Sequence, residues 1–398
     1  MIVVGGSGML GKVIMKRLNC MGTHFNNPSG TVLWTPSIVK DHSVIINCVC
    51  DKNVDRCEQN FQEAKKLNAD FVDILVRENP MAHLIQISTD YVYADGKVVD
   101  PMNIYGITKF LGELKAQRAH RWTVLRVPAL YDDPLDVVPT DLTRPVESSD
   151  TARYHTSCED VAEAVHQIVS RQLYGVLNFS ASIARSKNDI IRYLNLPVVT
   201  KTTTAPRSNH VYIGNDFNIL PRELDLAQFR IPRSPFIIID LDGTLLDTVN
   251  LHATCYELAH GDRDRKNQFL KKFTNISFKW NSELLIDFVH ENNINHVVLT
   301  NTTMDVVDHF RACVPKLNLL KNFVTKDMYT NRKPDLEPYE LAMKYNKGEP
   351  VMVLDDLVHN LSPMKRYTRL LFHMSDVVHD KTVFTLNDFG RLVDAIRG

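Results

Sequence analysis

The sequence predicts a two-domain α/β protein in which each domain is built around a parallel β-sheet, the first of them doubly wound. Three observations support this prediction. An apolar strand at Met1–Val4 runs directly into a glycine-rich loop and a helical pattern. A second buried strand, Phe236–Ile239, delivers acidic residues to its carboxyl end. Apolar runs alternate with helical patterns after each of these strands, which is typical of parallel sheets.

The totals describe an ordinary water-soluble composition. The chain has 398 residues, 23% charged and 44% apolar, with a net charge of -1. This length allows two or three domains. The neutral balance gives no support for nucleic acid or membrane as the main partner, and no apolar run is long enough to span a membrane.

The start of the chain and its cysteines bear on the compartment. Because the chain begins directly on a strand, we expect no signal peptide. The seven cysteines are scattered, without the paired spacing of zinc sites. We therefore expect reduced thiols and a cytoplasmic protein.

The first motif is the loop that follows Met1–Val4. Gly5, Gly8 and Gly11 have a spacing that permits a tight turn, close approach to a pyrophosphate and close helix–strand packing. With Met9 and Leu10 they form the expected cofactor-binding segment, where a helix N-terminus supplies N–H donors. The expected cofactor is NADP or NAD. The next strand, Met21–Asn26, offers neither an acid for a ribose hydroxyl nor a cation for a 2′-phosphate, and NADP is slightly preferred.

The second motif carries acid–base chemistry. Tyr105 and Lys109 lie four residues apart, so a helix places them on one face, where the ammonium is expected to lower the pKa of the phenol. Lys109 can also hold the cofactor ribose. Thr89 ends the strand Leu84–Ser88 and can donate a hydrogen bond to a substrate carbonyl. An exposed helical pair without a function is the alternative for Tyr105 and Lys109.

These motifs give a family resemblance for residues 1–232. This part resembles extended short-chain dehydrogenases/reductases of the dTDP-4-dehydrorhamnose reductase type, which have a Rossmann-type sheet and a small substrate-binding lobe. The segments that carry the resemblance stand in the family's order: Val44–Cys48, Val54–Glu58, Ser88–Val92, Tyr105–Lys109, Leu125–Tyr131, Tyr154–Ala162 and Ala205–Asn209. The resemblance implies that Thr89, Tyr105 and Lys109 are catalytic and that Tyr105 protonates the C4 oxygen of a 4-keto sugar nucleotide.

Two departures leave the substrate open. The spans from Gly22 to Ser43 and from Tyr93 to Tyr105 are shorter than is usual in the family. The family also contains a non-enzymatic relative, the regulatory β-subunit of methionine adenosyltransferase, which binds NADP. The alternative for this half is therefore a non-catalytic NAD(P)-binding regulatory module.

A short linker with two prolines and two arginines, Phe229–Pro235, separates the halves, with the boundary placed between residues 232 and 233. After it, Asp240 and Asp242 follow the strand Phe236–Ile239, and Gly243 permits a tight turn. Two carboxylates at a strand end form a hard oxygen site for Mg²⁺, and one of them can attack phosphorus.

Two further strands and a lysine complete the second site. The strand beginning at Val297 ends in Thr300 and Asn301, suited to phosphate oxygens. Lys333 stands just before a proline at an expected helix start, and a third strand ends in Asp355 and Asp356. These residues carry charge that would offset the repulsion between a phosphoester and a carboxylate nucleophile.

In this order the motifs resemble those of the haloacid dehalogenase superfamily, phosphatase branch, across residues 233–398. The resemblance implies a Rossmannoid domain with a minimal cap, Asp240 as nucleophile and Asp242 as general acid/base. It also implies phosphate binding by Thr300, Asn301 and Lys333. The implied Mg²⁺ ligands are Asp240, Asp242, Asp355 and Asp356.

The sequence thus predicts a bifunctional enzyme, an NAD(P)H-dependent sugar-nucleotide reductase fused to a Mg²⁺-dependent phosphatase of a small phosphoester. Small molecules are the expected partners, with neither nucleic acid nor membrane, and a homodimer is possible. A phosphate-binding scaffold without activity is the alternative for the second half.

Overall fold

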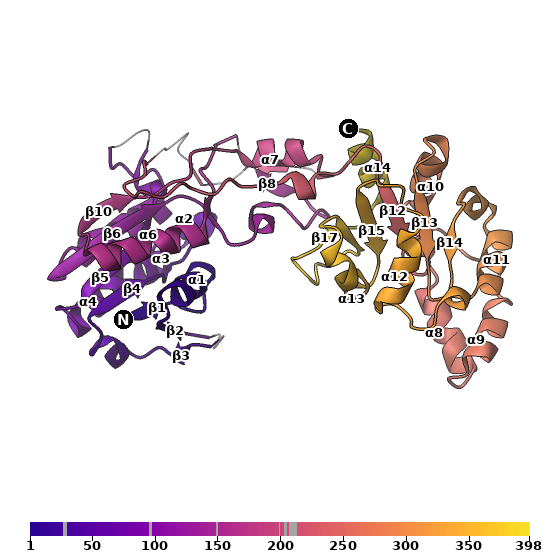
Figure 1. The fold of residues 1–398 in the computed structure, drawn as a ribbon, viewed down its shortest axis with the longest axis horizontal. Helices are drawn as coiled ribbons and strands as arrows, with labels where there is room; N and C mark the ends of the chain where they lie inside the picture. Colours follow the sequence, from indigo (N-terminus) through magenta and orange to yellow (C-terminus); the bar gives the residue numbers. More distant parts are fainter. Residues whose placement is uncertain (27–29, 95–97, 149, 199, 203–204, 207–212) are drawn as a thin grey trace. The chain divides into compact units, whose positions relative to one another are not determined.

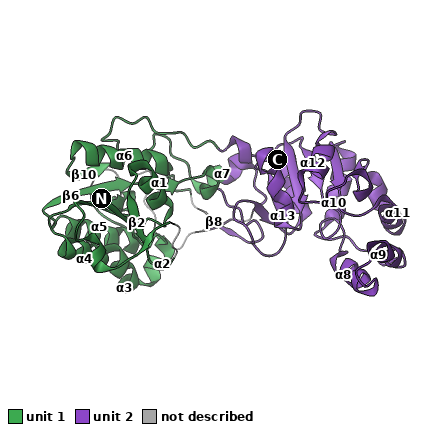
Figure 2. Cartoon of the chain, turned by 60° about the horizontal axis from the view of Figure 1, so that its bottom comes forward, with its two compact units in different colours: residues 1–137, 147–190, 202–225 green, residues 138–146, 191–201, 226–398 purple. Residues whose placement is uncertain are grey.

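The computed structural model describes residues 1–398 except 27–29, 95–97, 149, 199, 203–204 and 207–212. The chain divides into two compact units, coloured separately in Figure 2. Unit 1 comprises residues 1–137, 147–190 and 202–225, and unit 2 comprises residues 138–146, 191–201 and 226–398. Residues 207–209, part of the segment Ala205–Asn209 that carries the family resemblance, lie outside the described residues.

Unit 1 contains a sheet of seven strands among its described residues, all paired in parallel (Figure 1). In spatial order the strands are β10 (Gly175–Asn178), β6 (Arg121–Val127), β5 (His83–Thr89), β4 (Val44–Asn47), β1 (Ile2–Val4), β2 (Met21–His24) and β3 (Val32–Leu33). Strand β5 is buried along its whole length, as expected for a strand covered on both faces.

Helices cover both faces of this sheet, which makes it doubly wound. Apolar side chains of α1 and α6 pack in one core cluster, and those of α4 and α5 pack in another across the sheet. The helices of unit 1 are α1 (Met9–Leu18), α2 (Val54–Gln59), α3 (Phe61–Lys65), the π-helical η2 (Lys66–Asp70), α4 (Phe71–Glu78), α5 (Ile104–Ala116) and α6 (Cys158–Arg171), with α7 (Lys187–Leu194) crossing into unit 2.

Shorter elements complete unit 1 and its borders. They are the 3₁₀ turns η1 (Pro36–Val39), η3 (Asp90–Val92) and η4 (Pro134–Val137) and the strands β7 (Leu130–Tyr131), β8 (Val146–Ser148), β9 (Thr156–Ser157) and β11 (Thr200–Thr202). Strand β7 pairs with β9, and β8 pairs with β11.

Unit 2 contains a second parallel sheet, of six strands among the described residues. In spatial order they are β14 (Phe323–Val324), β13 (His296–Leu299), β12 (Phe236–Ile239), β15 (Val351–Asp355), β16 (Leu371–Met374) and β17 (Phe384–Leu386). The β-branched run of β12 is fully buried at the centre, next to β15. The α/β class with parallel sheets, predicted from the sequence, is therefore confirmed.

Helices and turns connect these strands. They are η5 (Ala227–Phe229), α8 (Val249–Leu258), α9 (Arg263–Leu270), α10 (Ser282–Glu291), α11 (Met304–Cys313), η6 (Pro315–Leu319), η7 (Lys326–Met328), α12 (Leu336–Met343), α13 (Val358–Leu361), η8 (Ser362–Arg366) and α14 (Phe389–Arg397). Only short helices, α8 to α10, stand between β12 and β13 in the described chain.

The border between the units differs from a single cut at residue 232. The main junction lies between Asp225 and Leu226, and residues 138–146 and 191–201 belong to unit 2. Residues 138–146 lie along β17, where Leu142 N donates to Thr385 O at 2.9 Å and Thr385 N donates to Thr140 O at 2.8 Å. The residue pattern of a short segment such as 138–146 does not indicate which of the two sheets it will pair with.

All seven cysteines are free thiols. Among the described residues, no helix combines the length and the apolar character that crossing a bilayer requires.

Candidate active sites

A cavity of about 710 Å³ in unit 1 gathers the residues predicted for the dinucleotide and for the reductase chemistry. Its walls include all the expected members: Gly5, Gly8, Met9, Leu10, Gly11, Thr89, Tyr105 and Lys109. The cavity lies where β1 and β5 end, because parallel strands bring their carboxyl ends to one edge of the sheet.

The glycine loop is shaped by close backbone approach. Gly5 has φ of +84°, and the Gly8 amide donates to the Gly5 carbonyl at 3.1 Å. A Cβ on Gly11 would overlap the carbonyl of Gly5 and the backbone of Gly6. Helix α1 then starts at Met9 without a side-chain cap or an acidic first turn. Its N-terminal amides are thus available to an anion such as a pyrophosphate.

The side chains of Thr89, Tyr105 and Lys109 meet in this cavity, but the lysine is directed differently from the prediction. Lys109 Nζ is buried and donates to the Ile87 carbonyl at 2.7 Å. Burial raises the pKa of Tyr105 well above its usual value, and a hydrogen bond with Thr89 lowers it in part. The prediction that Lys109 lowers the pKa of the phenol is therefore wrong. The ammonium of Lys109 donates to a strand carbonyl, and the burial of Tyr105 is the largest influence on its pKa.

A buried acid supports the threonine and was missed from the sequence. Asp90 Oδ1 accepts from Thr89 Oγ1 at 3.1 Å, and Asp90 Oδ2 accepts from Arg153 Nη1 at 3.1 Å. Burial raises the pKa of Asp90, while Arg153 lowers it. The only signal for Asp90 was its place directly after Thr89 in Ser88–Val92.

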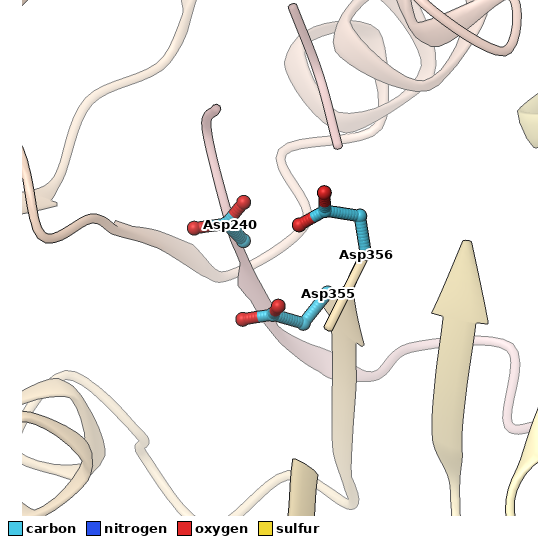
Figure 3. A group of neighbouring side chains, drawn as sticks. All are labelled: Asp240, Asp355 and Asp356. Atoms are coloured by element: carbon cyan, nitrogen blue, oxygen red, sulfur yellow. The ribbon is translucent and has the colours of Figure 1, made fainter. Parts of the chain in front are cut away.

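In unit 2, three carboxylates converge at the ends of adjacent strands. Because Ile239 pairs with Leu354, the next residues, Asp240 and Asp355, emerge side by side. Oxygen atoms of Asp240, Asp355 and Asp356 lie within 4.8 Å of one another. Figure 3 shows the three side chains close together. Gly243, with φ of +88°, allows the chain to turn beside them, since a Cβ there would overlap the Asp356 carboxylate.

Lys333 lies against this acidic group. Its ammonium donates to Asp240 Oδ1 at 2.5 Å and to Asp355 Oδ2 at 2.8 Å, and all three side chains are buried. Asn360 Nδ2 donates to Asp355 Oδ1 at 3.0 Å. Burial raises the pKa of Asp240 well above its usual value although Lys333 lowers it, and burial beside Asp355 raises the pKa of Asp356 to about 6.

The donor set fits a hard divalent cation. Asp240 Oδ2 is buried without a hydrogen-bond partner in the described part of the chain, and Asp356 adds carboxylate oxygens beside it. Mg²⁺ takes oxygen ligands of this kind, and a cation here would relieve the crowding of negative charge. The residues present are therefore suited to hold Mg²⁺.

The Asp242 carboxylate lies outside the group formed by Asp240, Asp355 and Asp356, so its place among the four expected metal ligands stays a prediction. Its Oδ1 accepts from His252 Nε2 at 2.7 Å and from Thr248 Oγ1 at 2.8 Å. Its Oδ2 accepts from Thr300 and Thr302 Oγ1 at 3.1 and 2.7 Å. Burial raises the pKa of Asp242, but His252 and the hydroxyl donors outweigh it and hold this pKa well below its usual range.

The predicted phosphate-binding residues divide into two roles. Asn301 Oδ1 accepts from the Lys333 amide at 3.0 Å, so its amide group positions the lysine. The Thr300 hydroxyl already donates to Asp242, and the Thr300 carbonyl accepts from Tyr329 at 2.6 Å. His252 was missed because its spacing in α8 does not distinguish it from a packing residue, and Tyr329 was missed because it follows η7 in extended backbone outside any motif.

Comparison with known proteins concerns the N-terminal part of the chain. Residues 1–194 match the family described as RmlD substrate binding domain. Methionine adenosyltransferase 2 subunit beta of Danio rerio is 25% identical over 228 residues, 48% of this chain and 71% of the relative. The dTDP-4-dehydrorhamnose reductase of Escherichia coli is 33% identical over 107 residues, 24% of this chain and 35% of the relative.

Among solved structures, a hypothetical dTDP-4-dehydrorhamnose reductase from Sulfolobus tokodaii aligns with a TM-score of 0.48 at 22% identity. That alignment covers 56% of this chain and 97% of the other. The matched family and the E. coli relative place the reductase resemblance in the N-terminal part of the chain.

Proposed function

We propose that unit 1 is an NADPH-dependent reductase of a nucleotide-linked 4-keto-6-deoxy sugar and that unit 2 is a Mg²⁺-dependent phosphatase of a small phosphoester. The observation that carries the first assignment is the single cavity shared by the glycine loop, Thr89, Tyr105 and Lys109. The family match over residues 1–194 supports it. NADH remains the alternative cofactor.

The reductase roles follow from this arrangement. When bound, the nicotinamide cofactor supplies hydride to the C4 carbon of the keto sugar. The Tyr105 phenol, kept protonated by its raised pKa, gives its proton to the C4 oxygen. Thr89 turns its single hydroxyl proton from Asp90 Oδ1, which accepts it in this structure, to the same C4 oxygen. Lys109 holds the cofactor ribose while its ammonium remains bound to the strand carbonyl.

The phosphatase roles rest on the carboxylate group of Asp240, Asp355 and Asp356. Mg²⁺ held by these residues would supply positive charge for the phosphoryl oxygens. Asp240 attacks phosphorus, the bond to the leaving oxygen breaks, and water then hydrolyses the aspartyl phosphate. Lys333 offsets the charge of nucleophile and phosphoryl group, and the Asp242–His252 pair holds the proton that the leaving oxygen takes.

A second candidate for unit 1 is a regulatory module that binds NADP without catalysis. The similarity to the β-subunits of methionine adenosyltransferase 2 favours it. The two candidates differ in one assay, NADPH oxidation with a 4-keto sugar nucleotide. Oxidation that disappears in Tyr105→Phe supports the reductase, whereas tight NADPH binding without oxidation across a panel of such sugars supports the module.

The phosphatase assignment has its own test. Hydrolysis of an aryl phosphate should require Mg²⁺ and should disappear in Asp240→Asn. A full-length protein that binds phosphate but hydrolyses no ester in a broad panel would make unit 2 a scaffold instead.

A further inference from the structure

A second large cavity, of about 790 Å³, lies within unit 2 and away from the carboxylate group. Pro350 and Val351 line it at the start of β15, while Asp355 ends the same strand. At about 3.3 Å per residue, the strand separates the two by roughly 13 Å. The cavity is therefore a different site from the proposed phosphatase centre.

Five cationic side chains line this cavity, and no aspartate or glutamate is among its described lining residues. The cations come from the linker and from the turn before β16: Arg230, Arg233, Lys365, Arg366 and Arg369. The chain as a whole has a net charge of -1, so five positive side chains around one cavity make this region much more positive than the rest of the chain. A cavity lined by one sign of charge concentrates counter-ions.

Three of these cations have no acidic side chain as a partner among the described residues, although the Arg233 guanidinium lies beside the C-terminal Gly398. Arg230, Arg233 and Arg366 form neither an ion pair nor a side-chain hydrogen bond with any described residue. Arg230 and Arg366 instead lie over the rings of Tyr193 and Tyr367, at 5.4 and 5.2 Å from the ring centroids. Stacking of this kind fixes a planar guanidinium while leaving its N–H donors directed elsewhere.

The remainder of the lining is apolar or aromatic. Ile231, Pro232 and Leu370 form part of the wall, and the rings of Tyr193 and Tyr367 are 40% and 43% exposed. Exposed tyrosines beside arginines suit a ligand that has both a ring system and phosphate groups. The volume also lies within the range of small-molecule sites, which is about 300–1,000 Å³.

We propose that this cavity binds a nucleoside diphosphate. The unpaired arginines would take the two phosphates, and the tyrosine and apolar wall would take the base and sugar. The site is independent of the reductase and phosphatase assignments, since none of its residues belongs to either centre.

The first test measures the binding of UDP and of ADP to the full chain by calorimetry. A metal chelator is present in the buffer, and NADPH is added to occupy the cavity in unit 1. The double variant Arg230→Gln/Arg366→Gln should weaken binding roughly tenfold or more, because each lost charge-assisted contact is of that order. Lys344→Gln, an exposed cation on the same unit, is the matched control and should bind as the parent does. Equal affinity in the double variant would overturn the proposal.

The second test locates the ligand without any variant. Phenylglyoxal labels accessible arginines, and peptide mass spectrometry reads each position. UDP or ADP should protect Arg230, Arg233 and Arg366 but not Arg265, which is exposed elsewhere on unit 2. Labelling unchanged by either nucleotide contradicts the proposal, as does protection by a single-stranded oligonucleotide with none by UDP or ADP.

Discussion

Replacement of Lys333 by methionine gives the sharpest test of the charge balance in unit 2. The ammonium is 2.5 Å from one carboxylate oxygen and 2.8 Å from another, and its side chain is only 3% exposed. Removing one partner of a buried ion pair costs about 3–5 kcal/mol, because the remaining charge stays buried and unpaired. Lys333→Met should therefore destabilise unit 2 by that amount at pH 8 without Mg²⁺.

The pH dependence of this loss has a defined sign. Burial already raises the pKa of Asp240, and Lys333 lowers it, so without Lys333 the folded-state pKa of Asp240 should lie still further above its unfolded value. Such a group is neutral and tolerated at low pH, and stability is lost as pH rises through the folded pKa. The destabilisation should thus be smaller at pH 5 than at pH 8.

Mg²⁺ supplies an independent check. A cation at the carboxylates would offset the missing ammonium, so the variant should gain more stability from Mg²⁺ than the parent. At a concentration 100 times the dissociation constant, binding adds about 2.7 kcal/mol.

The assay follows unit 2 alone. Trp280 is the single tryptophan of unit 2, so a background with Trp34→Phe and Trp122→Phe makes its fluorescence a reporter for urea unfolding of that unit. Lys344→Met, on the surface, should shift the free energy of unfolding by less than about 0.5 kcal/mol. An unfolding midpoint for Lys333→Met equal to that of the background at pH 8 would refute the reasoning.

Three further predictions concern both units. Tyr105→Phe should lower reductase kcat by about 10²-fold or more, since a general acid contributes on that scale, while NADPH affinity measured by fluorescence stays unchanged. His252→Asn should lower phosphatase kcat by about 10-fold or more with little change in KM, because it removes the partner of Asp242; an unchanged kcat would exclude that role. His83 is buried and its pKa is lowered by burial to about 4, so unit 1 should lose up to about 3 kcal/mol as pH falls from 6.5 to 4. His83→Gln should flatten that dependence in acid unfolding followed by circular dichroism.

Much of the fold could be predicted because buried parallel strands have a clear sequence signature. The run Phe236–Ile239 is a continuous apolar segment, the strand before Thr89 is apolar at Leu84, Ile85 and Ile87, and both form inner strands of their sheets. The three converging carboxylates were predictable for the same reason, since strand ends in one parallel sheet share an edge.

Other features could not be read from the sequence because they depend on side-chain direction. Lys109 was expected to act on Tyr105, yet its ammonium reaches the Ile87 carbonyl. Asp242 follows Asp240 by two residues, but its carboxylate accepts hydrogen bonds from His252 and from threonine hydroxyls and lies outside the group of three carboxylates. Sequence spacing fixes where a residue emerges from the backbone, and hydrogen-bond partners then decide what its side chain faces.

The segment 138–146 has a practical consequence for expression of the second half by itself. A fragment that begins at the linker would lack residues 138–146, whose backbone exchanges hydrogen bonds with the backbone of Thr385. The backbone groups on that edge of β17 would then be unpaired and exposed to solvent. Exposed strand edges recruit other chains. The second half expressed by itself should therefore self-associate when it is concentrated, and adding residues 138–146 as a peptide should restore a monodisperse monomer.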